Sequence, residues 1–285
     1  MTRTAVFTAK VVGVWIAALV SSIFAAQLIE MGDEGIGTDG PLTGPQAFVI
    51  VNLVHAAVLG LIAERSTLRG KRLASLIWAT LFFAQSFLLL MEAAYFRDSL
   101  QMSQGLLLKS GLHVLLSGAI ISAVVGMLWQ EPVRQVQYGP PLTILPIRLA
   151  VIAAFYIICY FVAGYYIAWQ VNDVQQYYGF GEDIALVPLL LFQMLRGAMW
   201  GLLAYILVRS LVGRVGTRAF VVGISFSVLA TTQLLYPSSI MPWEVRFAHM
   251  VEVGISNFIF GFAASLILLA RHGEAGVSSA NSVSH

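Results

Sequence analysis

A polar pair of residues one helical turn apart occurs twice in this chain, each time inside a long apolar segment. The first pair is Asn52 and His55 and the second is Gln193 and Arg196, and each is followed by two small residues and then a glycine. An arginine near the centre of a bilayer costs roughly 3 kcal/mol or more, so such positions are usually kept for function. Because a guanidinium can pair with an anion and an imidazole can exchange a proton or ligate a metal, we expect binding chemistry at these sites.

More ionisable side chains lie in the same apolar segments. At about 1.5 Å per residue, His55 and Arg196 lie about 15 Å below the outer ends of their segments. Four others lie at shallower depths of about 6 to 11 Å: Glu92, His113, His249 and Glu252. Since lipid-facing charge is costly, these side chains should point into one shared cavity. The predicted binding residues are Asn52, His55, Glu92, His113, Gln193, Arg196, His249 and Glu252.

A structural role is the alternative for each of these residues. Four side chains near helix ends could instead extend to headgroups or outer water: Glu92, Lys109, Arg246 and His249. His55 and Arg196 lie too deep for that, and the alternative for them is a hydrogen bond that joins two helices.

Composition defines the class of protein. Hydrophobic residues make up 59% of the chain and charged residues 11%, whereas soluble domains have about 25% charged residues. The chain is therefore a multi-pass membrane protein with the lipid bilayer as its partner. A net charge of +2 gives no reason to expect a nucleic-acid partner. Its single cysteine, Cys159, excludes an internal disulfide and any cysteine-built iron–sulfur or zinc cluster.

Eight apolar segments have the roughly 20 residues that a membrane crossing needs. They lie at about 9–30, 45–64, 72–96, 105–129, 147–170, 184–209, 218–236 and 246–271. Because lipid offers no hydrogen bonds to the backbone, and because the segments lack the alternation of barrel strands, they should be helices. The predicted fold is therefore all-α and polytopic.

Basic residues predict the orientation. If the N-terminus is inside, twelve of the sixteen Lys and Arg residues lie at inner ends, as expected for a bacterial inner (plasma) membrane protein with both termini cytoplasmic. An alternative is that the first segment is a cleaved signal peptide, with Arg3 and Lys10 before its apolar run. That run is longer than usual, and residues 14–18 have a counterpart at 150–154.

Internal similarity indicates a duplication. Besides the repeated polar pair, His113 precedes Gly118 in the fourth segment as His249 precedes Gly254 in the eighth. We therefore expect two parallel four-helix repeats, at 1–135 and 136–272, and a short disordered cytoplasmic tail at 273–285. Such symmetry commonly places a binding site at the junction of the halves.

The first class of function is a transporter-like protein with a polar cavity open to the outer side. The cavity would bind or pass a small solute, an ion or a lipid headgroup. Arg196 would face an anionic group, and Glu92 or Glu252 would relay protons with the histidines. No pair of Pro- or Gly-broken helices in matching positions, the usual sign of a transport site, is visible.

Histidines in the second, fourth and eighth segments support a second class. His55, His113 and His249 in an eight-helix plan resemble three of the four axial ligands of the haem A synthases, which implies a haem-binding redox protein. The cofactor is not determined by the sequence, and haem b is one candidate. Arg196 occupies the fourth position. The family's glutamate before the first histidine and its His-Arg dipeptide are absent, because Ala56 follows His55.

A third class is a metal-dependent membrane hydrolase. His249 and Glu252, one helical turn apart, could form a zinc site with His113 and Glu92 and leave one position for water. The common His-Glu-x-x-His signature is missing. The segments around Arg196 and His249 also resemble uncharacterised bacterial multi-pass membrane proteins, a resemblance that implies location and no activity.

Overall fold

The architecture is all-α and crosses the membrane repeatedly. A computed structural model describes residues 2–32, 35–97, 102–130, 142–178 and 185–270. The structure is 85% helical, and the described residues form no strand. Eight helices in these ranges are long and apolar enough to span a membrane, which confirms the predicted fold class. The tail at 273–285 and the junction between the proposed repeats lie outside the described residues.

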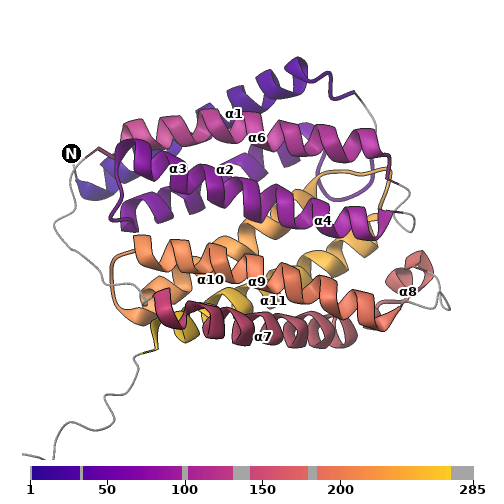
Figure 1. The fold of residues 1–285 in the computed structure, drawn as a ribbon. Helices are drawn as coiled ribbons and strands as arrows, with labels where there is room; N and C mark the ends of the chain where they lie inside the picture. Colours follow the sequence, from indigo (N-terminus) through magenta and orange to yellow (C-terminus); the bar gives the residue numbers. More distant parts are fainter. Residues whose placement is uncertain (1, 33–34, 98–101, 131–141, 179–184, 271–285) are drawn as a thin grey trace, which may run out of the picture.

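Figure 1 shows the eight crossings in two layers, with the first half of the chain above the second. The first four crossings are α1 (Arg3–Leu28), α2 (Gly44–Arg65), α3 with η1 and α4 (Gly70–Leu81, Phe82–Phe87 and Leu88–Tyr95), and α6 (Gln104–Leu128). The last four are η2, α7 and η3 (Leu142–Ile144, Leu145–Tyr166 and Ala168–Gln170), α9 (Leu186–Ser210), α10 with η4 (Val215–Thr231 and Thr232–Leu235), and α11 (Trp243–Leu269). The short α8 (Asn172–Tyr178) lies between α7 and α9.

Local sequence defines where the helices begin. At the start of α2, the Thr43 side chain accepts from the Gln46 backbone N–H, and the Gln46 side chain accepts from Thr43. This capping box, with a proline in the first turn, satisfies donors that the helix leaves open. Ser103 caps α6 in a similar way through the Leu106 N–H.

The two halves share one packing pattern. In the first half α6 packs against α1 and α3, and α1 packs against α2; in the second, α11 packs against α7 and α10, and α7 packs against α9. Between the halves, α2 contacts α10, and α3 with α4 contacts α9. Let α1, α2, α3 with α4, and α6 correspond to α7, α9, α10 and α11. The contact of α2 with α10 then corresponds to the contact of α9 with α3 and α4, as a two-fold axis between the halves would require.

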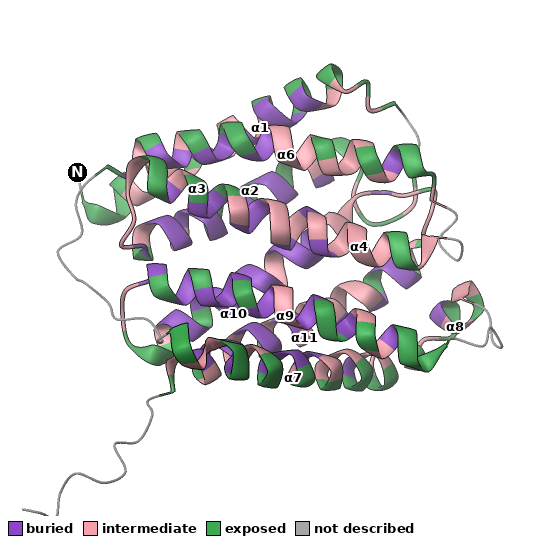
Figure 2. Cartoon of the chain, in the orientation of Figure 1, coloured by how far each residue is buried: buried purple, intermediate pink, exposed green. Residues whose placement is uncertain are grey.

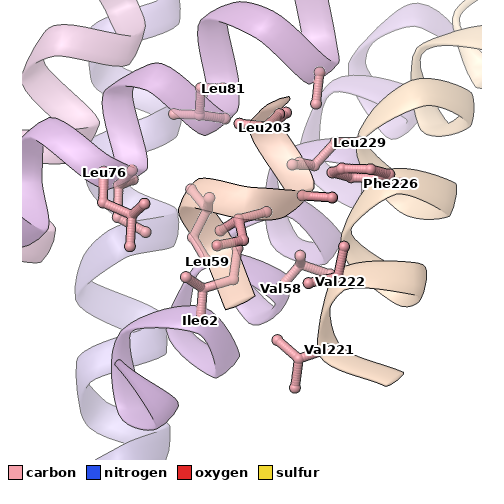
Figure 3. Packing of buried hydrophobic residues seen from close by; sticks show 14 of the residues in the cluster. Val58, Leu59, Ile62, Leu76, Leu81, Leu203, Val221, Val222, Phe226 and Leu229 are labelled. Atoms are coloured by element: carbon pink, nitrogen blue, oxygen red, sulfur yellow. The ribbon is translucent and has the colours of Figure 1, made fainter. Parts of the chain in front are cut away.

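Side chains from both halves form the central core. Figure 3 shows Leu59 of α2 and Leu81 of α3 gathered with Leu203 of α9 and Phe226 of α10. Figure 2 shows the complementary distribution, with exposed residues along the outward side of α7 and buried residues concentrated on α10. The interface between the halves is therefore part of one continuous hydrophobic core.

Two connections at one end of the bundle also pair with each other. Ser66 and Leu211 form an antiparallel bridge, in which the Thr67 N–H donates to the Ser210 carbonyl at 2.6 Å and the Val212 N–H donates to the Arg65 carbonyl at 2.7 Å. These reciprocal bonds join the α2–α3 connection to the α9–α10 connection.

Glycines permit a close helix contact between α10 and α11. A Cβ on Gly223 would lie 2.9 Å from the carbonyl oxygen of Phe258, and one on Gly261 would lie 3.1 Å from the Cα of Gly223. Small residues that let two backbones approach are typical of membrane helix interfaces. The pair therefore sets the distance between α10 and α11.

We expect Gly223→Ala to lower the apparent Tm of the protein in detergent, because the added methyl group meets a backbone oxygen that can yield only if α11 moves. Gly216→Ala is the matched control, since a Cβ there meets nothing within 4 Å. The control gains only the helix propensity of alanine, at most about 1 kcal/mol. Equal effects of the two substitutions on Tm, measured by tryptophan fluorescence, would contradict the close-packing account.

Candidate functional site

A large cavity lies between the third crossing and the second half of the chain. Its volume is about 1110 Å³, which is slightly larger than the roughly 300–1,000 Å³ of ordinary small-molecule sites. The walls come from η1, α4, α7, α9, η4 and α11, and the lining continues to α8 and to the loop before α11. Most of the lining is apolar, so the few polar groups decide which ligand can bind.

A π-helix shapes the wall that the third crossing contributes. The wider turn at η1 brings Gln85 and Ser86 to the cavity, and Glu92 follows one to two turns later on α4. Single π-turns inside transmembrane or soluble α-helices often occur at functional sites, because they rotate the helix face that follows. Phe82 stacks on Trp78 and on Phe87 around this turn.

An ion pair joins the two halves at the cavity wall. The Nη2 of Arg196 donates to the Oε2 of Glu92 at 2.7 Å, and its Nη1 donates to the Oε1 of Gln193 at 2.9 Å. The Arg196 side chain is 3% exposed, whereas that of Glu92 is 30% exposed. The anionic partner expected for Arg196 is thus a carboxylate of the same chain, and it is Glu92 that faces the cavity.

Aromatic rings enclose this ion pair. The Arg196 guanidinium lies over the rings of Tyr156 and Phe192, at 5.7 Å from each centroid. Phe192 also stacks on Tyr95 of α4 at 4.3 Å. Among the buried side-chain atoms that the structure describes, the Nε of Arg196 and the Nε2 of Gln193 have no hydrogen-bond partner. Arg196 is therefore held in place by one carboxylate, one amide and two rings.

A second polar chain crosses the cavity from α8 to α11. The Nδ1 of His249 lies 2.8 Å from the Oε2 of Glu252, and its Nε2 lies 3.1 Å from the hydroxyl of Tyr178. The carboxylate accepts from Nδ1, and the Tyr178 hydroxyl, which can donate or accept, pairs with Nε2. Tyr178, His249 and Glu252 therefore form one continuous hydrogen-bonded chain.

Burial keeps the phenol of Tyr178 protonated. The pKa of Tyr178 is raised above its usual value, mainly because burial disfavours the charged form, and nearby Tyr177, Glu92 and Glu252 raise it further. Burial likewise raises the pKa of Tyr236, which also lines the cavity, to about 12. Both hydroxyls therefore remain hydrogen-bond donors at neutral pH.

A third charged pair holds the loops at this end of the bundle. Arg246 is buried, and its Nη2 donates to the Oδ1 of Asp39 at 2.7 Å and to the Asp39 carbonyl at 3.0 Å. Its remaining nitrogens donate to the carbonyls of Met241, Leu234 and Tyr236. One expectation was that this arginine extends to outer water, but the structure buries it between the loop after α1 and the loop before α11.

Four predicted site residues do not line the cavity. Gln193 lies behind the wall, where it accepts from Arg196. The Nε2 of His55 lies 2.6 Å from the hydroxyl of Thr232, which joins α2 to η4 and is the helix-joining hydrogen bond given as the alternative for this residue. The Nε2 of His113 lies 3.1 Å from the Ser22 carbonyl of α1, and the side-chain amide of Asn52 donates to a carbonyl four residues earlier in its own helix.

Several lining residues were absent from the predicted set. Tyr156 and Tyr160 lie one turn apart on α7, and Gln233 and Asn257 add amides from η4 and α11. The tyrosine pair at i and i+4 in an apolar segment was a usable signal, because a buried hydroxyl needs a partner or water.

The histidines do not fit haem as an axial pair. His249 is the only one of the three proposed axial histidines in the cavity lining, and both of its ring nitrogens are engaged by Tyr178 and Glu252. His55 and His113 each use Nε2 in a contact with another helix. Across the described ranges, no group of three or more His, Cys, Asp or Glu side chains could hold a metal ion.

Comparison with known proteins adds no further assignment. No protein-family model, no curated protein and no solved structure matches this chain. Arguments about function therefore start from the cavity and the groups that line it.

Proposed function

We propose that this protein binds a small amphiphilic solute in the cavity and exchanges it with the outer side of the membrane, as a transporter-like protein does. The single observation that carries the proposal is a cavity of about 1110 Å³ with a mainly apolar wall and a few converging polar groups. Such a lining suits a ligand that has an apolar body and one polar end.

Each polar group then has a role in the proposal. Glu92, held by Arg196, and Glu252, held by His249, present acceptors to the polar end of the ligand. His249 and Tyr178 offer a path for exchange of a proton with the outer side. No observation at His55 or His113 favours haem or metal chemistry over the hydrogen bonds that they make.

Orientation and duplication belong to the same proposal. The basic residues favour a bacterial inner membrane location with both termini cytoplasmic, which places the α8 end of the cavity on the outer side. The matching packing of α1 to α6 and α7 to α11 supports two repeats, at 1–135 and 136–272. The cavity would then lie at the junction of the repeats, as is common in transporters.

Cys159 provides a direct test, because it is the only cysteine of the chain and it lines the cavity. We expect N-ethylmaleimide to modify Cys159 in the folded protein. Gly164→Trp should reduce this rate about tenfold or more, because a side chain at Gly164 enters the cavity next to Glu252. The measurement is the mass shift of the intact protein with time.

Gly216→Trp is the matched control, since position 216 is open to its surroundings, and its rate should equal that of the wild type. A wild-type Cys159 that reacts only after unfolding, or a Gly164→Trp variant that reacts as fast as the control, would refute an accessible cavity.

A further inference from the structure

We infer that the cavity selects a cationic amphiphile, such as an organic amine or quaternary cation with an apolar body. This inference rests on the proposed function and names the class of ligand. It follows from which charged groups face the cavity and which are covered.

Both arginines of the lining are covered by their partners. The Arg196 side chain is 3% exposed and lies behind Glu92. Arg246 is buried, and each of its three nitrogens donates to a carbonyl or to the Asp39 carboxylate. Neither guanidinium therefore offers an open face to an anionic ligand, and each is neutralised by its own carboxylate.

The carboxylates of the lining are more exposed than its arginines. The side chains of Glu92 and Glu252 are 30% and 11% exposed, against 3% for Arg196 and 2% for Arg246, and that of His249 beside Glu252 is 19% exposed. Glu252 has no guanidinium or ammonium partner in any ion pair that the structure describes, only the imidazole of His249. Arg196 is paired with Glu92 and Arg246 with Asp39, so Glu252 is an additional carboxylate on the cavity wall whose ion-pair partner is an imidazole.

Aromatic rings make the apolar part of the cavity wall favourable to cations as well. Tyr156, Tyr160, Trp169, Tyr178 and Tyr236 all line the cavity. The face of an aromatic ring carries negative potential and attracts organic cations, above all those with quaternary nitrogen. Outside the cavity, Asp173 on α8 and Glu244 at the start of α11 are exposed at the same end, so the field there also favours the approach of a cation.

Two probes of nearly the same shape and opposite charge test the inference. Tetraphenylphosphonium and tetraphenylborate are titrated against purified protein in a non-ionic detergent, and protection of Cys159 from N-ethylmaleimide reports occupancy. Free probe concentrations are measured by dialysis, so that probe dissolved in micelles does not count. We expect the phosphonium to protect at a concentration about tenfold or more below that of the borate.

Two isosteric variants connect the preference to the charge on α11. Glu252→Gln should remove most of the preference for the phosphonium, and Asn257→Asp, which adds a carboxylate to the same wall, should increase it. Each variant is first checked for a wild-type elution volume in gel filtration. If Glu252→Gln does not fold, the Asn257→Asp result decides alone.

The outcomes separate this inference from the proposed function. Equal or stronger protection by the borate, or no protection by either probe, would overturn the assignment to cations while Cys159 remains accessible. An unchanged preference in both variants would overturn it as well. If Cys159 cannot be modified in the folded protein, the proposed function fails and the inference fails with it.

Discussion

Replacing Glu92 with glutamine should destabilise the protein more than replacing its partner Arg196 with methionine. Among the described residues, Glu92 supplies the carboxylate that pairs with the Arg196 guanidinium, whose side chain is 3% exposed. Glu92→Gln removes that carboxylate, and breaking a buried ion pair in this way costs about 3–5 kcal/mol. Arg196→Met leaves a carboxylate that is 30% exposed and already faces the cavity, where water can solvate it. The two partners of one ion pair should therefore differ in effect.

The double variant tests whether the loss of stability in Glu92→Gln comes from the unpaired charge of Arg196 or from altered packing of its side chain. In Glu92→Gln with Arg196→Met, no charge remains buried, and the unbranched methionine keeps contact with Tyr156 and Phe192. We expect its apparent Tm to lie above that of Glu92→Gln alone, a non-additive result that two coupled residues should give. The measurement is thermal unfolding in detergent, followed by tryptophan fluorescence. A double variant less stable than both single variants would show that shape, and not charge, governs this site.

The position of a residue along its helix follows from the sequence, and its direction around the helix does not. Counting residues from the helix ends identified Glu92, Arg196, His249 and Glu252, which the structure places along one cavity. The same count selected His55, which instead bonds to Thr232 on η4. A membrane helix is apolar on its lipid face and on its core face, so hydrophobic periodicity cannot show which neighbour a deep polar side chain meets.

A local backbone change near Glu92 is a second feature that the sequence did not indicate. The π-turn at η1 rotates the part of the third crossing that carries Glu92, and nothing in the hydropathy of that segment marks the turn. The role of Tyr178 also depended on tertiary structure, because the residue belongs to the connection between α7 and α9 and reaches His249 only after α8 packs against α11. The number of crossings and their class, by contrast, followed from length and apolarity alone.

Replacing Arg246 with leucine should cause the largest loss of stability after the Glu92 variant. The buried guanidinium donates to Asp39 in the loop after α1. It also donates to three backbone carbonyls in η4 and the loop before α11. Its removal leaves those acceptors without a donor, and each buried polar group left unsatisfied costs about 1–3 kcal/mol. We expect a total loss of several kcal/mol, measured as a fall in apparent Tm in detergent.

Lysine at this position tests whether geometry or charge matters. Arg246→Lys keeps the positive charge beside Asp39, but an ammonium is a single point with three donors and cannot reach all the carbonyls that the planar guanidinium joins. Its Tm should therefore lie closer to that of Arg246→Leu than to that of the wild type. The matched control is Arg3→Gln, because the Arg3 side chain is 90% exposed in its ion pair with Glu64, and such surface pairs contribute about 0–1 kcal/mol. A lysine variant as stable as the wild type would mean that attraction to Asp39 alone holds the two loops together.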